Sequence, residues 1–120
     1  MDKQLLRKLR TVAADGRTLT YYQVAERAGL DMSQRPDREA LSSLLGEISS
    51  HEHRHGRPLL SAVVVHEQFQ MPGGGFYDVA LGTGRMAADE DQQAYWDREL
   101  RAVHDFWAAR RRALGEVAQA

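Results

Sequence analysis

Apolar residues recur at helical spacing in two segments of the first half of the chain. Near the N-terminus, one apolar stripe is formed by Leu5, Leu6, Leu9, Val12 and Ala13. Between residues 37 and 50, a second stripe is formed by Leu41, Leu44, Leu45 and Ile48. Such spacing puts the side chains on one face of an α-helix. We therefore predict two amphipathic helices, the second being the hub against which the rest of the fold packs.

A shorter helix over residues 20–28 is predicted from its end signals. Thr20 suits the N-cap position, and Gln23 three residues later completes a capping box. Gly29 suits the left-handed residue that follows a helix. A helix of about two turns is unstable alone, so we expect tertiary packing to hold it.

The helix over 20–28 and the helix over 37–50 together have the order of a helix-turn-helix motif. Residues 31–36 are polar and read as the connecting loop, and Asp37 is placed to cap the second helix. The second helix of such a motif is the one that enters the major groove of DNA.

The middle of the chain predicts a short β element. Residues 59–65 form an apolar run that is rich in β-branched side chains and preceded by Pro58, which indicates a buried strand in a β element around residues 59–66. Residues 70–75 include Pro72 and three consecutive glycines, so we expect a turn without regular structure. Residues 76–81 fit either a return strand or one helical turn, and the pattern does not decide between them.

A long helix is predicted over residues 89–118, beginning at Asp89 or Asp91. Its apolar stripe consists of Trp96, Leu100, Val103 and Trp107, widened by Tyr95, Ala102 and Phe106. Glu99 and Asp105 are expected to face away from the centre of this stripe. Aromatic residues at this spacing are most often core, but so wide a face could also pair with a second copy, so a homodimer is a further prediction.

This order of elements predicts a mostly helical α+β fold, a winged-helix-like three-helix bundle with a short β element. The chain has 120 residues, which is the usual size of one domain, so we expect residues 1–120 to form a single unit. The long C-terminal helix would pack across the bundle.

Residues 19–29, Leu-Thr-Tyr-Tyr-Gln-Val-Ala-Glu-Arg-Ala-Gly, resemble the first helix of the winged-helix half of alkyltransferase-like DNA-binding proteins. Those proteins have a threonine or serine and a tyrosine before a short helix of this kind. Their Pro-Cys-His-Arg motif has no counterpart here, because residues 58–63 read Pro-Leu-Leu-Ser-Ala-Val and the chain has no cysteine. The resemblance therefore implies a scaffold and no alkyl-transfer activity.

Composition and net charge limit the expected cellular location and the expected binding partners. The N-terminus has no apolar signal segment, and the longest apolar run, residues 62–65, is far too short to cross a bilayer. We therefore expect a cytoplasmic protein that does not contact membranes. The net charge is −1, which argues against a dominant electrostatic attraction to nucleic acid.

The preferred function is non-enzymatic binding by a small bacterial-type accessory or regulatory protein, with a protein partner or DNA and no cofactor. The contact residues predicted on basic positions are Arg35, Arg38, Arg54 and Arg57. Around the glycine-rich tip, Phe69, Met71 and Phe76 are unusually apolar for a loop and are predicted contacts as well. The tip lacks the lysine and the glycine spacing of phosphate-binding loops.

An alternative interpretation is a zinc-dependent hydrolase. His51-Glu52-His53-Arg54-His55 matches the His-Glu-x-x-His pattern, in which two histidines bind zinc and the glutamate activates water. The third ligand would come from His66, Asp78 or His104. Against this, histidines near a helix C-terminus also complement the helix dipole, so a surface histidine cluster is the simpler interpretation.

Overall fold

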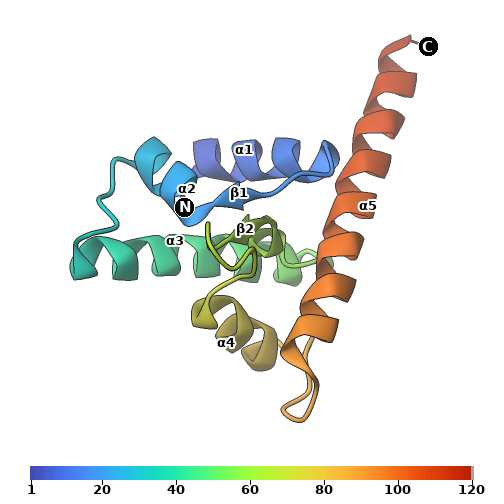
Figure 1. Cartoon of the computed structure of the whole chain (residues 1–120). Helices are drawn as coiled ribbons and strands as arrows, with labels where there is room; N and C mark the ends of the chain where they lie inside the picture. The colour runs from blue at the N-terminus through green and yellow to red at the C-terminus, as the bar shows by residue number, and fades with distance from the viewer. Residues whose placement is uncertain (120) are drawn as a thin grey trace.

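The computed structural model describes residues 1–119 and contains five α-helices, one 3-10 helix and two short strands (Figure 1). In chain order these are α1 (Lys3–Ala14), β1 (Leu19–Thr20), α2 (Tyr21–Ala28), α3 (Arg35–Arg54), η1 (Leu60–Val63), β2 (Val64–Val65), α4 (Gly74–Gly82) and α5 (Gln92–Gln119). The predicted class, a mostly helical α+β fold, is confirmed.

The helices are stacked around a small central sheet. Figure 1 shows α1 on one side of β1 and β2, α3 on the other side, and α4 beyond α3. Helix α5 crosses one end of this stack, and its C-terminal part extends past α1. Helix α5 also packs against α1 and η1, and α3 packs against η1 and α4.

The predicted hub helix is confirmed with revised ends. Helix α3 begins at Arg35 and extends to Arg54, so it includes part of the histidine-rich segment. Asp37 is not its N-cap; the Asp37 carboxylate accepts a hydrogen bond from the backbone N–H of Asp31 in the preceding loop. The inward face is formed by Leu41, Leu45 and Ile48, which are buried, while Leu44 is half-buried.

Residues 59–65 are the most deeply buried part of the chain, as predicted, but most of them do not form a strand. Residues 60–63 form η1, and only Val64 and Val65 form a strand, parallel to β1 in the register Leu19–Val64 and Thr20–Val65. An uninterrupted apolar run shows neither the alternation typical of a half-buried strand nor the spacing typical of an amphipathic helix, so its pattern cannot distinguish the two.

Side chains from other elements satisfy backbone groups of Leu59 and of η1. The Glu99 carboxylate accepts from the N–H of Leu59, the Ser49 hydroxyl accepts from the N–H of Ser61, and the Trp96 indole donates to the carbonyl of Ala62. Buried backbone groups need such partners, so these contacts fix η1. The expectation that Glu99 faces away from the core is therefore wrong; it is buried.

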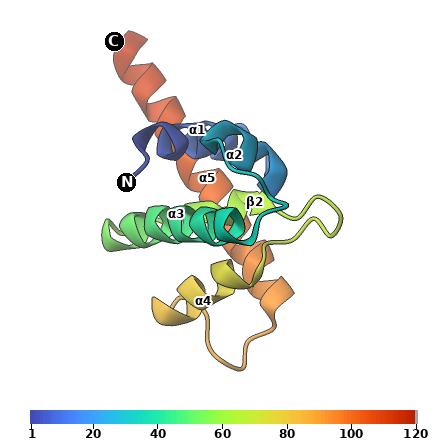
Figure 2. The same cartoon turned by 90° about the vertical axis from the view of Figure 1, so that its left-hand side faces the viewer.

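Residues 76–81, for which the sequence pattern did not decide between strand and helix, lie in α4. Phe76, Tyr77 and Ala80 are its buried face. No return strand follows β2 in the described chain. The loop that joins β2 to α4 instead projects from the body of the molecule, as Figure 2 shows.

Helix α5 contributes its aromatic face to the core. Tyr95, Trp96, Val103 and Trp107 are buried. Leu114 and Val117, on the part that extends past α1, are exposed. Dimerisation through α5 stays a prediction. Within residues 1–119, no helix is both long and apolar enough to cross a membrane.

The capping box of α2 is confirmed, and it gives a testable stability effect. The Thr20 hydroxyl accepts from the N–H of Gln23, and the Gln23 side chain accepts from the N–H of Thr20. We expect Thr20→Ala to lower the free energy of unfolding by about 0.5–2 kcal/mol, measured by urea denaturation. Thr18→Ala is the control, because the Thr18 hydroxyl has no hydrogen bond within residues 1–119. An equal loss in both variants would contradict the capping role.

Candidate functional site

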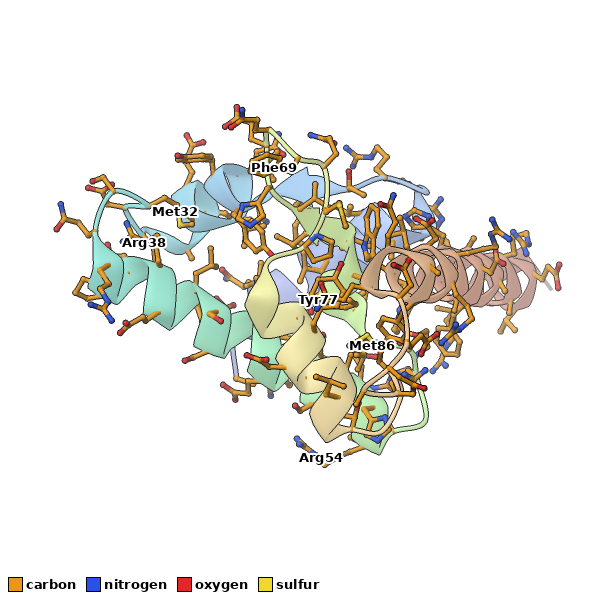
Figure 3. The ribbon with its side chains drawn as sticks, turned by 60° about the horizontal axis from the view of Figure 1, so that its bottom comes forward. Met32, Arg38, Arg54, Phe69, Tyr77 and Met86 are labelled. Atoms are coloured by element: carbon orange, nitrogen blue, oxygen red, sulfur yellow. The ribbon has the colours of Figure 1, made fainter. Side chains whose placement is uncertain are left out.

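A pocket of about 240 Å³ opens between α3, α4 and the start of α2. Its apolar lining consists of Met32, Leu41, Leu45, Phe76 and Val79. Its polar lining consists of Tyr21, Arg38, Ser42, Ser61 and His66 with the glycines Gly46, Gly73, Gly74 and Gly75. In Figure 3, Met32 and Arg38 lie at the N-terminal end of α3, on the same side of the molecule as the loop that carries Phe69.

Small residues allow α3 and α4 to approach each other at the pocket wall. A Cβ atom on Gly75 would lie 2.6 Å from the Ser42 Oγ, and a Cβ on Gly46 would lie 3.6 Å from the Val79 Cγ2. The expectation that residues 70–75 hold no regular structure is wrong for the last two of them. Gly74 and Gly75 form the first turn of α4, where backbone N–H groups lack helical partners.

Tyr21 connects the glycine-rich segment to α2. Its hydroxyl oxygen accepts a hydrogen bond from the N–H of Gly73 at 2.7 Å, and its ring packs against His66 with the ring centroids 4.9 Å apart. Burial raises the pKa of the Tyr21 hydroxyl, and the hydrogen bond from Gly73 offsets part of that rise. The hydroxyl therefore keeps its proton at neutral pH and can donate it to a bound group.

The formal charge of the pocket lining comes from Arg38. Arg38 is exposed at the mouth, where its guanidinium also donates to the carbonyl of Met32. The pocket lining includes His66 and no aspartate or glutamate. The Ser42 hydroxyl has no hydrogen bond to any described residue. The pocket thus offers an apolar floor, several hydrogen-bond donors and no carboxylate.

The four predicted arginines do not form one surface. Arg35 and Arg38 lie in the first turn of α3, and Arg54 lies at the opposite end, about 25 Å away at 1.5 Å per residue (Figure 3). Arg35 is paired with Glu39. Arg57 is half-buried and bound to Glu52, so it is not available for contact.

The three predicted contact residues of the tip differ in exposure. Phe69 is 69% exposed. Met71 is half-buried and packs against the core. Phe76 is only 6% exposed, because it lies on the buried face of α4, so its placement on an exposed tip was wrong; it belongs to the pocket floor.

The zinc-hydrolase interpretation does not fit the geometry of the histidine segment. Glu52 is 0% exposed, and its carboxylate accepts hydrogen bonds from Arg10, at 2.6 Å, and from Arg57. A carboxylate held by two guanidiniums is not placed to activate water. The rings of His51 and His55 pack together with their centroids 4.4 Å apart.

The proposed third ligands lie elsewhere. His66 packs on Tyr21, and His104 lies 3.0 Å from the carbonyl of Arg17. Across residues 1–119, no three histidine, aspartate or glutamate side chains are grouped to hold a metal ion.

The pocket residues outside the predicted set are chiefly Tyr21, Ser42, His66 and the three glycines. The only sequence pattern that marks these residues is the run of glycines beside aromatic residues. That pattern does not show which helix packs against the glycines. The chain matches no protein-family model, and searches of curated proteins and of solved structures find no significant match.

Proposed function

We propose that this protein is a non-enzymatic binding protein that recognises a partner protein by accepting one apolar side chain of that partner in the pocket between α3 and α4. The arrangement of α2, a short loop and α3 supports a helix-turn-helix scaffold, whereas the parallel pairing of β1 and β2 does not provide the hairpin wing of a winged helix. In this proposal the scaffold serves to hold the pocket and its rim.

The size of the pocket carries the proposal. Sites that enclose whole drug-sized ligands usually measure roughly 300–1,000 Å³, and this pocket measures about 240 Å³. It therefore suits a single side chain better than a cofactor. Protein interfaces typically rest on a few such anchors inserted into preformed pockets.

Exposed aromatic side chains extend the pocket into a contact surface. A groove lined by Tyr22, His66, Glu67, Gln68 and Phe69 shares His66 with the pocket. Tyr22 is 59% exposed, and Phe69 is the most exposed aromatic residue of the loop that projects in Figure 2. Large exposed aromatic groups beside an apolar pocket are typical of a protein-contact surface.

The polar groups of the pocket indicate the chemistry of the inserted segment. Arg38 and the hydroxyls of Tyr21 and Ser42 are donors, and no carboxylate lines the pocket. A partner segment with an apolar side chain next to a carboxylate or carbonyl would complement them. DNA reading by α3 is less well supported, because the first two turns of α3 carry Asp37 and Glu39 beside Arg35 and Arg38.

A small probe tests the pocket without knowledge of the partner. N-acetyl-phenylalanine supplies an aromatic side chain beside a carboxylate. We expect it to bind with an affinity on the order of millimolar, and to shift the backbone amide NMR signals of Ser42 and of residues 73–75. N-acetyl-phenylalanine amide should bind several-fold more weakly, because it lacks the charge that Arg38 attracts.

The neighbouring serines of α3 provide a matched pair of variants. Ser42→Phe fills the pocket and should abolish these shifts, whereas Ser43→Phe places the same group on an exposed position outside the pocket and should preserve them. Circular dichroism of both variants checks the fold. Equal binding by the two variants, or shifts centred away from α3 and α4, would refute the pocket as the binding site.

A further inference from the structure

A strip of basic side chains runs across α2, α1 and α5, on the side of the molecule away from α4 (Figure 1). One groove is lined by Gln4, Arg7, Lys8, Thr11 and Arg27. A second groove is lined by Arg10, Thr11, Ala14, Trp107, Arg110, Arg111 and Leu114. Thr11 lines both, so the two grooves adjoin each other. Together they contain six cationic side chains and no carboxylate.

The nearby carboxylates do not cancel this charge. Glu52 is bound by both Arg10 and Arg57, and Asp15 is bound by both Arg17 and Arg111. Each of these clusters has two positive charges and one negative charge, so each keeps a net charge of +1.

The other four cations of the strip have no ion pair within residues 1–119; they are Arg7, Lys8, Arg27 and Arg110. Asp2 lies at the edge, where it caps the N-terminus of α1. The strip is therefore locally positive, although the chain as a whole has a net charge of −1.

We infer that this strip binds the phosphate backbone of a nucleic acid duplex, independently of base sequence. Five of the six cations are arginines, whose planar guanidinium groups match phosphate oxygens in a two-pronged arrangement. When such cations neutralise the regularly spaced phosphates of a duplex, they release the counterions condensed on it, and this release favours binding. This binding is separate from the proposed function, since the strip and the pocket have no lining residue in common.

Two other polyanionic partners fit the strip less well. A segment that binds a membrane surface is usually one amphipathic helix with its apolar face inserted, whereas the cations of the strip come from three helices, with α5 crossing the end of α1 (Figure 1). An acidic protein would need apolar anchors, and the strip offers only Leu114 as a large exposed apolar group.

The test measures fluorescence anisotropy of a labelled DNA duplex of about 20 base pairs. With about four phosphate contacts, we expect affinity to fall roughly a hundredfold between about 50 mM and about 200 mM salt. A second duplex of unrelated sequence and equal length should bind equally well. The double variant Arg7→Gln/Arg27→Gln should lower affinity about tenfold or more at the lower salt concentration and reduce the salt dependence.

The control is Arg35→Gln/Arg54→Gln, which removes two exposed arginines from α3 and should leave affinity within about twofold of the original. All four positions are exposed on helices, so the fold should persist in both variants. The inference is overturned if no duplex binds at the lower salt concentration, or if both double variants lose affinity equally. Binding to vesicles of phosphatidylglycerol and phosphatidylcholine in the absence of duplex binding would also overturn it.

Discussion

Replacing Glu52 with alanine should lower the free energy of unfolding by about 3–5 kcal/mol, because the change leaves two guanidinium groups without their shared partner. The Glu52 side chain is fully buried, and it joins Arg10 of α1 to Arg57 just after α3. The Arg10 guanidinium also stacks on the Trp107 ring, 4.5 Å from its centroid. Losing the carboxylate therefore loosens the contact of three elements. Urea denaturation followed by tryptophan fluorescence measures the effect.

A second variant at this position separates the effect of charge from that of packing, and a variant of an exposed ion pair is the control. Glu52→Gln keeps the shape and one hydrogen-bond acceptor, so its loss should be smaller than that of alanine but still well above that of an exposed pair. Glu39→Ala breaks the exposed pair with Arg35 and should cost less than about 0.5 kcal/mol. If Glu52→Ala cost no more than Glu39→Ala, the two-arginine cluster would not hold these elements together.

The second large effect is expected at the centre of α3. Ile48 is fully buried, so Ile48→Ala removes its apolar contacts and leaves a cavity. Such changes cost about 2–5 kcal/mol, and we expect a value in this range by the same denaturation method.

Leu44 provides the comparison, because it lies on the edge of the same stripe and is only half-buried. Leu44→Ala should cost about 1–2 kcal/mol, since less apolar surface leaves the core. A larger loss at Leu44 than at Ile48 would mean that α3 is rotated relative to the arrangement described.

Local signals were enough to predict the first three helices. The stripes of α1 and α3 follow from spacing alone, and the ends of α2 follow from Thr20 and Gly29, whose roles depend on adjacent residues. The N-cap of α3 was misplaced by three residues, at Asp37 instead of Gln34, because Asp37 lies inside the helix and interacts with the preceding loop.

Contacts between residues distant in the chain determine the structure where the sequence pattern was undecided or led to a wrong prediction. The segment 59–65 reads as a strand, but Glu99 contacts Leu59 from 40 positions away in the chain, and Trp96 contacts Ala62 from 34 positions away. These partners fix a 3-10 helix, and no local pattern contains them. Glu99 appeared to lie on the outer face of α5 for the same reason, since the buried N–H that it binds comes from another element.

Both candidate surfaces arise from residues distant in sequence. The pocket depends on Tyr21 meeting Gly73, which is 52 positions further along the chain. The basic strip depends on α5 returning to α1, where Arg111 binds Asp15 from 96 positions away. A net charge of −1 concealed the strip, because the total charge does not report how charges are distributed over the surface.

The most direct test of the proposed pocket is a crystal structure of the protein grown with N-acetyl-phenylalanine. We predict that the phenyl ring lies against Leu41, Leu45 and Phe76, with its carboxylate turned toward Arg38. A pocket that stays empty at saturating probe, or a probe bound only on another face of the molecule, would contradict the account.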